Sequence, residues 1–152
     1  MAIQWILKKF DDLTPQELYA AIRLRNEVFV VEQNCVFQDA DNKDPYCWHL
    51  MGWDNNNLIA YTRLVPPGTA YKEPSIGRVV TSPSVRGAGA GKQVMEESLR
   101  QLKALYGNIS IRIGAQLYLK KFYSSFGFKQ SSEIYLEDGI EHIEMLLNQS
   151  IS

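Results

Sequence analysis

Hydrophobic positions recur along the chain at two spacings, every second residue as in strands and every third or fourth as in helices. The strand-like runs are residues 3–9, 48–53, 58–65, 76–81, 109–113, 128–136 and 140–147. The helix-like runs are residues 15–31, 94–105 and 117–126. Hairpins alternating with helical crossovers predict a mixed α/β fold, in which helices pack on a mixed sheet.

Turn and cap residues support several of these boundaries. Thr14 is a suitable N-cap, with Pro15 at the first helical position and Glu17 at the third. Residues 54–57, Asp-Asn-Asn-Asn, join two strand runs, and these residue types tolerate the left-handed conformation of tight turns. Residues 137–139, Glu-Asp-Gly, predict a second hairpin.

The composition is that of an ordinary globular protein, with 45% hydrophobic and 22% charged residues. A length of 152 residues predicts one domain, residues 1–152, with a single core. The net charge is −1 and no Lys/Arg run exceeds two residues, which argues against a nucleic-acid partner. No apolar run approaches transmembrane length, so no membrane partner is expected either.

The cysteines and the acidic residues do not indicate a metal site. Cys35 and Cys47 form neither a CxxC pair nor a His/Cys ligand pattern, so packing roles are expected. Two free thiols without an export signal favour the cytoplasm. Acidic segment 38–44 partly resembles a calcium loop, but Asp44 stands where that loop needs Gly and Leu50 where it needs Glu. The segment is therefore expected to be solvated or to attract a cationic amine.

The sharpest local feature is a glycine-rich segment between a strand run and a helix run. It consists of Arg86, Gly87, Ala88, Gly89, Ala90, Gly91 and Lys92. Glycines let backbone N–H groups approach an anion, and a helix N-terminus adds unpaired donors and a positive dipole end. With a cation at each end, the segment predicts a cradle for a phosphate or pyrophosphate.

Two common phosphate loops do not fit this segment. A Walker A loop needs four residues between its first glycine and its Gly-Lys pair, and Ser or Thr after that pair. Here three residues separate Gly87 from Gly91-Lys92, and Gln93 follows. In either register, the dinucleotide fingerprint G-x-G-x-x-G lacks its last glycine. The structural alternative is a Gly/Ala-rich turn that eases the packing of the helix on the sheet.

The segment resembles the acetyl-CoA signature of the GNAT superfamily, [R/Q]-x-x-G-x-[G/A], with Arg86, Gly89 and Gly91 at the defined positions. The resemblance implies a mostly antiparallel central sheet, flanked by helices, with a splayed strand before the loop. Loop amides would hold the pyrophosphate of acetyl-CoA, whose product is CoA. The strand residues implied to hold its pantetheine arm are Val79, Val80 and Thr81.

A second GNAT signature, N-x-x-A-x-x-x-Y-x-x-x-G-[F/Y], matches the last helix run in part. Tyr123, Gly127 and Phe128 fit it, whereas Gln116 replaces Asn and Leu119 replaces Ala. These departures put side-chain contacts to the pantetheine arm in doubt, and the fold less so.

A helix through this signature would carry several residues toward the cofactor. Gln116 and Tyr123 are seven apart, so such a helix would place them on nearly one face, about 10 Å apart along the axis. Phe122 is expected beside them in the cofactor site. Alternatively, Tyr123 is an ordinary amphipathic tyrosine between helix and sheet.

Four segments narrow the resemblance to the ElaA-like branch of GNAT proteins. They are residues 25–35, 76–80, 114–116 and 135–143. The resemblance runs from about residue 5 to about residue 146, and this branch is poorly defined in substrate.

Acetyl transfer to an amine needs a base, a donor to the developing oxyanion and an acid for the leaving thiolate. The candidate acid is Tyr123, because a tyrosine pKa near ~10 lies above the ~8.5 of a cysteine-like thiol. The backbone N–H of Val80 is the candidate oxyanion donor. Family precedent implies direct attack in a ternary complex.

The base stays open between Glu32 and His49, and each of them also has a structural alternative. The acceptor pocket is expected near Phe29, Glu32, His49 and His142. The acceptor itself is expected to be a primary amine, on a small molecule or a peptide. A CoA-binding regulatory module without catalysis is the competing interpretation, and a homodimer stays open.

Overall fold

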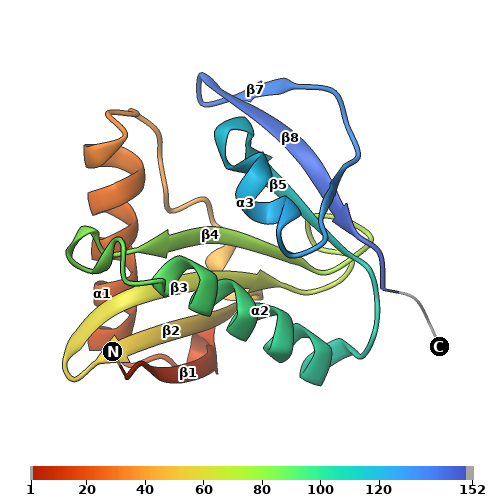
Figure 1. The fold of residues 1–152 in the computed structure, drawn as a ribbon. Coiled ribbons are helices and arrows are strands. Elements are labelled where there is room, and N and C mark those ends of the chain that lie inside the picture. The colour runs from red at the N-terminus through yellow and green to blue at the C-terminus, as the bar shows by residue number, and fades with distance from the viewer. Residues whose placement is uncertain (1, 150–152) are drawn as a thin grey trace.

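The structure is a computed structural model, and it describes residues 2–149 (Figure 1). The strands are β1 (Gln4–Lys9), β2 (Trp48–Asp54), β3 (Asn57–Val65), β4 (Ser75–Thr81), β5 (Ile111–Gln116), β6 (Lys129–Gln130), β7 (Tyr135–Glu137) and β8 (Ile140–Leu147). The α-helices are α1 (Pro15–Arg25), α2 (Ala90–Tyr106) and α3 (Lys120–Ser124), and α1 continues into a π-helical segment, Asn26–Glu32.

The strands form two antiparallel sheets that touch at one end. One sheet has the order β1-β2-β3-β4, and the other has the order β5-β8-β6, with β7 also paired to β8. The backbone N–H of Arg112 in β5 donates to the carbonyl of Pro74, just before β4, at 3.1 Å. Beyond that contact, β4 pairs only with β3 and β5 only with β8 within the described residues. This divergence is visible in Figure 1 and confirms the expected fold class with its splayed strand.

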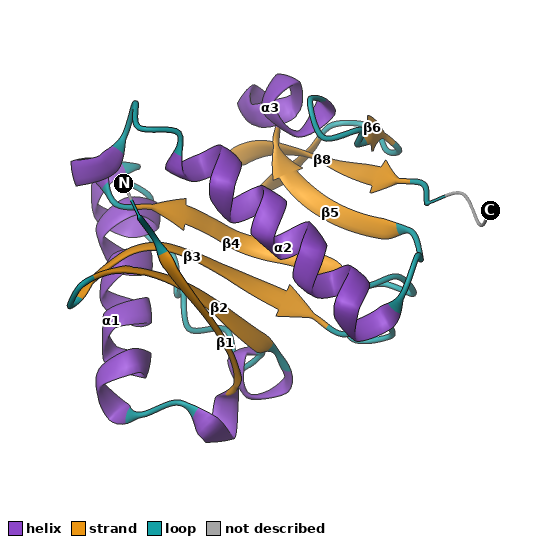
Figure 2. Ribbon diagram, turned by 60° about the horizontal axis from the view of Figure 1, so that its bottom comes forward, coloured by secondary structure: helices purple, strands orange, loops and turns teal. Residues whose placement is uncertain are grey.

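Helices α1 and α2 cover opposite faces of the first sheet (Figure 2). Tyr61 of β3 is buried with α1, whereas Leu64, of opposite parity on the same strand, is buried with α2. Alternate residues of a strand point to opposite faces, so β3 contributes to two hydrophobic cores. The core under α2 continues into β5, β8 and α3 and includes Tyr123.

The carboxylates of the acidic segment 38–44 are paired within the protein, so they are not free for a substrate. They pair with arginines of α1, β3 and β4. Asp39 Oδ2 lies 2.8 Å from Arg25 Nε, and Asp44 Oδ1 lies 2.9 Å from Arg25 Nη1 and from Arg63 Nη1. The Arg25 side chain is 1% exposed. The segment therefore serves to hold the structure together, because its charges neutralise buried arginines.

The same ion-pair network reaches an irregularity in β4. Tyr61 pairs with Val80 and Arg63 pairs with Gly77, so β4 carries one residue more than β3 between these pairs. Arg78 sits in this bulge with φ +49°, in the left-handed region that non-glycine residues rarely adopt. Its Nε lies 2.9 Å from Asp39 Oδ1. Asp39 thus ties the bulge of β4 to the end of α1.

Local turn and cap predictions are confirmed. Thr14 Oγ1 accepts from the Glu17 N–H at 3.1 Å, and Glu17 Oε1 accepts from the Thr14 N–H at 2.8 Å. The hairpins at 54–57 and 137–139 join β2 to β3 and β7 to β8. These signals worked because each depends on residues close in sequence.

The C-terminal elements differ from those expected. Instead of a helix over 117–126, Leu117–Leu119 form a 3-10 turn and α3 covers only Lys120–Ser124. The strand before it is longer than the expected run 109–113, because β5 continues to Gln116, which pairs with His142 of β8. The expected strand at 128–136 is broken into the short strands β6 and β7, both of which pair with β8.

We expect Asp44→Asn to lower the free energy of unfolding by about 3 kcal/mol at pH 7, because it leaves two buried arginines short of a charge. Burial alone would raise the pKa of Asp44, but its bonds to Arg25 and Arg63 outweigh burial and hold the pKa below its usual range. The stabilisation is therefore present above the unfolded pKa of about 3.9 and is lost as pH falls through the lower folded value.

Urea unfolding at pH 7 and at pH 3 measures this effect, and the gap between wild type and Asp44→Asn should narrow at pH 3. Glu96→Gln is the control, since Glu96 pairs with Lys92 at 3.8 Å on the surface. That change should cost well under about 1 kcal/mol. An Asp44→Asn variant as stable as this control would contradict the role of the network.

Candidate active site

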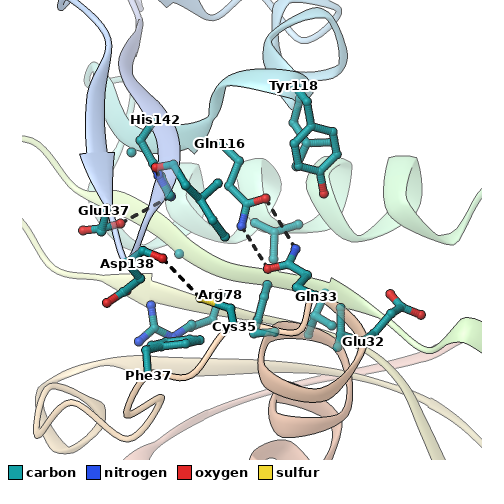
Figure 3. Close-up of a pocket in the computed structure, with 18 of the residues that line it drawn as sticks. Glu32, Gln33, Cys35, Phe37, Arg78, Gln116, Tyr118, Glu137, Asp138 and His142 are labelled. Atoms are coloured by element: carbon teal, nitrogen blue, oxygen red, sulfur yellow. Dashed lines mark hydrogen bonds and ion pairs between the residues drawn. The ribbon is translucent and has the colours of Figure 1, made fainter.

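A cavity of about 420 Å³ lies where β4 and β5 diverge (Figure 3). Its walls come from the π-helical segment, β4, β5, α3 and the β7–β8 hairpin. The residues expected from sequence that line it are Phe29, Glu32, Val79, Val80, Thr81, Arg86, Gln116, Tyr123 and His142. Along Val79–Thr81, and within residues 2–149, β4 has a strand partner only on its β3 side, so backbone groups on its other edge are available to a ligand.

The glycine segment forms an open anion-binding turn at the start of α2. Gly87 and Gly89 have φ of +85° and +81°, and a Cβ added at either would meet nothing within 4 Å. The first α2 hydrogen bond runs from the Gln93 N–H to the Gly89 carbonyl at 3.1 Å. The amides just before Gln93 therefore lack helical acceptors, as at any helix start, and can bind an anion.

The cavity and the glycine turn meet at Arg86, while the remaining loop residues lie outside the cavity lining. Phe122, which was expected to bind the cofactor, also lies outside that lining. A Cβ at Gly91 would lie 3.8 Å from the Phe122 ring, so Phe122 packs under the start of α2. Its aromatic neighbours Tyr123 and Phe126 lie edge-on at centroid distances of 5.2 and 5.3 Å.

Arg86 and Glu32 form a two-point ion pair, with N–O distances of 2.5 and 2.6 Å. The Arg86 hydrogen bonds hold the pKa of Glu32 below its usual range. A carboxylate with a lowered pKa accepts a proton less readily, which disfavours Glu32 as the base. The pair instead links the π-helical segment to the glycine turn.

Tyr123 is part of the cavity wall. Its side chain is almost wholly buried between Phe122 and Phe128, and burial raises its pKa above the usual tyrosine range. Burial thus keeps the proton on the phenol, as a proton donor requires, and at the same time makes the phenol a weaker acid. Tyr118, which the sequence did not single out, lines the same region, and its ring is largely exposed (Figure 3).

Gln116 stands at the end of β5, not on a helix face with Tyr123. Its side-chain amide exchanges hydrogen bonds with the amide of Gln33 at 3.3 and 3.4 Å. Figure 3 shows this pair spanning the cavity from β5 to the end of the π-helical segment. Gln33 was missed because nothing in the local pattern relates it to a residue 83 positions away.

His49 does not reach the cavity, so the structure corrects its expected role as base and substrate contact. Its side chain is buried on β2, with Nε2 3.0 Å from the Asp44 carbonyl and Nδ1 2.7 Å from the Tyr61 hydroxyl. Because a carbonyl only accepts, Nε2 carries the hydrogen and Nδ1 accepts from Tyr61. Burial lowers the pKa of His49, so the neutral, fully bonded form is favoured.

His142 lies at the other end of the cavity from the glycine turn, in the β7–β8 hairpin (Figure 3). Its Nδ1 donates to the Ile140 carbonyl at 2.7 Å, and its Nε2 lies 3.4 Å from Glu137 Oε2. Cys35 Sγ donates to the Asp138 carbonyl at 3.3 Å and so connects the hairpin to the chain after the π-helical segment. Sequence reasoning missed Glu137, which it treated only as a turn residue.

Known proteins are similar to this chain in both sequence and fold. The acetyltransferase (GNAT) domain family matches residues 10–148. The chain belongs to the GNAT acetyltransferase family. It is 40% identical to ElaA of Escherichia coli over 145 residues, which are 94% of this chain and 95% of ElaA. A UPF0039 protein of Synechocystis is 43% identical over 147 residues, with 96% of each chain covered.

Solved GNAT structures agree with this assignment. An acyl-CoA N-acyltransferase from Pseudomonas aeruginosa superposes with a TM-score of 0.91 at 42% identity, covering 95% of this chain and 99% of that one. The crystal structure of E. coli ElaA gives 0.88 at 39% identity, with the same coverage. The ElaA-like GNAT resemblance is therefore confirmed. Within residues 2–149, none of the helices has both the length and the apolar character needed to cross a membrane.

We expect His49→Gln to lower the free energy of unfolding by about 1–3 kcal/mol, because the buried partners of His49 lose a hydrogen bond. The folded chain keeps His49 neutral, whereas the unfolded chain takes up a proton below about pH 6.5. Stability from His49 is thus present at higher pH and falls as pH drops, so the variant should show a flatter stability profile between pH 5 and 7. CoA affinity, measured by calorimetry, should not change. A large loss of CoA affinity would contradict the purely structural role of His49.

Proposed function

We propose that this protein is an acetyl-CoA-dependent N-acetyltransferase that acts on a primary amine of a small molecule or peptide. The carrying observation is one cavity between the diverging strands, with an anion-binding turn at one end and a buried phenol in its wall. An extended ligand with a pyrophosphate at one end and a thioester at the other fits a cavity that has the anion-binding turn at one end and the phenol farther along its wall. Two structures sharing the fold, one from Bacillus subtilis and one an aminoglycoside 6'-N-acetyltransferase, were determined with CoA, which supports the choice of donor.

Each wall of the cavity has a proposed part in the reaction. Within residues 86–92, the amides that do not already donate to a backbone carbonyl bind the pyrophosphate; those of Arg86 and Ala88 donate to Pro83 and Val85. The free edge of β4 at Val79–Thr81 binds the pantetheine arm. The proposed oxyanion donor is a backbone N–H on the free edge of β4 beside Val80, because Val80 pairs with Tyr61 and directs its own N–H toward β3. Tyr123 donates a proton to the departing sulfur. The acceptor approaches from the His142 side, and attack is direct, so neither cysteine needs to be acylated.

The alternative is a CoA-binding regulatory module without catalysis, favoured by the Gln116 departure from the GNAT signature. A module that only binds CoA has no need for a buried protonated phenol on the cavity wall. Acetyl-CoA with a panel of amines, alcohols and thiols separates the two, with release of CoA thiol as the readout. Acylation of an amine supports the enzyme, and CoA binding without thiol release for any acceptor in the panel supports the module.

Gly89→Glu should weaken CoA binding by at least about tenfold, because it places a side chain and a negative charge among the amides of the turn. Gly68→Glu is the matched control. Gly68 has φ +82° and open space around it, like Gly89, but it lies in the turn after β3. Calorimetry on both folded variants measures the effect, and equal affinities in the two would remove the pyrophosphate site from this turn.

Tyr123→Phe keeps the ring packed between Phe122 and Phe128 and removes only the proton donor. With chemistry rate-limiting, turnover should fall about 10²-fold or more while CoA affinity changes little. Tyr118→Phe is the control, because it removes a phenol from the same cavity without removing the proposed acid. If Tyr123→Phe turned over an acceptor as fast as wild type, Tyr123 would not be the acid.

A further inference from the structure

The hydrogen bonds of His142 define where this side chain can take up a proton. The Ile140 carbonyl can only accept, so Nδ1 carries the hydrogen of the neutral ring. A neutral imidazole has one N–H, and Nε2 therefore holds a lone pair. That nitrogen lies 3.4 Å from the carboxylate of Glu137, and both residues line the cavity.

The surroundings of His142 provide acceptors for both ring N–H groups once the ring carries a second proton. The imidazolium would donate from Nδ1 to a carbonyl and from Nε2 toward a carboxylate, so both N–H groups have an acceptor. Tyr135 of β7 stacks on the ring at 5.9 Å with an interplanar angle of 27°. Gln116 of β5 is its neutral strand partner. The Arg78 guanidinium lines the same cavity but is bonded to Asp39 and Asp41.

Glu137 can serve a second cation in addition to this ring. Its side chain is 61% exposed, whereas that of His142 is 10% exposed, so an ammonium can reach the carboxylate from the cavity mouth. A bound ammonium beside the ring disfavours a second positive charge on His142. The approach of a charged amine thus keeps Nε2 unprotonated and ready to accept.

We propose that Glu137 binds the ammonium form of the acceptor and that His142 Nε2 takes its proton, which makes the acceptor nucleophilic inside the cavity. This inference rests on the proposed function and limits the acceptor to amines that are cationic in solution. The other base candidates are already engaged: Glu32 is paired to Arg86, and His49 is buried with both nitrogens bonded.

The proton balance of the reaction closes with these groups. An N–H bond of the ammonium breaks, and its proton bonds to Nε2. The freed nitrogen lone pair attacks the thioester carbonyl carbon, the C–S bond breaks, and Tyr123 gives its proton to sulfur. The nitrogen loses a second proton, which returns to Tyr123 through solvent. One amide and one thiol form, and one proton leaves through His142.

Two probe amines separate this role from a structural one. Benzylamine is an ammonium at pH 7 and needs deprotonation, whereas aniline is already neutral. His142→Gln should lower kcat/KM for benzylamine about 10²-fold and change that for aniline little. Its rate with benzylamine should then follow the neutral amine fraction in solution and keep rising to higher pH than in wild type. Equal losses with both amines would overturn the proposal, because damage to the fold or to CoA binding affects both.

Glu137→Gln tests the ammonium contact and should raise KM for benzylamine severalfold with little change in kcat. Glu141→Gln is the matched control, because Glu141 is an exposed acidic neighbour of His142 whose side chain points to the other face of β8. It should behave as wild type. A loss as large in Glu141→Gln as in Glu137→Gln would mean a general charge effect and would contradict the site.

A binding readout keeps this inference separate from the proposed function. Addition of benzylamine at pH 7 should shift the imidazole NMR signals of His142 in wild type but not in Glu137→Gln. If these shifts occur and no amine is acetylated, the transferase proposal fails and the ammonium site stands. If amines are acetylated but the His142 signals do not respond, the Glu137–His142 assignment is wrong.

Discussion

The buried pairing of Arg25 with Asp39 and Asp44 is the constraint on which the cavity depends. An arginine that is 1% exposed requires its counter-charges, and they come from a segment with little regular structure of its own. Asp39 meets that requirement and binds Arg78 in the β4 bulge at the same time. The charge of one helix residue thus holds β4 in the bent path along which it leaves β5.

The two ends of the cavity differ in how they are supported. At the end with the glycine turn, glycines and a helix start present backbone amides, whose positions follow from local geometry. At the end with the β7–β8 hairpin, His142 and Glu137 are joined to the rest of the cavity wall by the Cys35 contact to Asp138. Substitution therefore alters the two ends differently, because side chains on a hairpin can be exchanged while the backbone geometry of a turn is kept.

The sequence predicted the features that depend on neighbouring residues. The Thr14 cap, the two hairpins and the glycine turn follow from local chemistry, and the signature around Arg86 identified the family. Contacts between distant segments could not be predicted, since no local pattern indicates that Arg25 is buried or that Gln33 contacts Gln116. His49 was misjudged for the same reason, because its partner Tyr61 lies on the neighbouring strand. The strand run expected at 109–113 was too short for the same reason, because β8 extends the pairing of β5 to Gln116.

The Gln33–Gln116 contact joins two walls of the cavity by hydrogen bonds between neutral groups, whereas the contacts of Arg25 described above are ion pairs. Both amides are neutral, and each has a further donor and acceptor beyond the bonds they share. If a polar group of a ligand replaces one of these amides as hydrogen-bond partner, no buried charge is left without a partner. Loss of an aspartate beside Arg25, in contrast, leaves a buried charge unpaired. The ion pairs that hold β4 in place are therefore costly to break. The Gln33–Gln116 hydrogen bonds, which join β5 to the end of the π-helical segment, can be replaced by hydrogen bonds to a ligand at little cost.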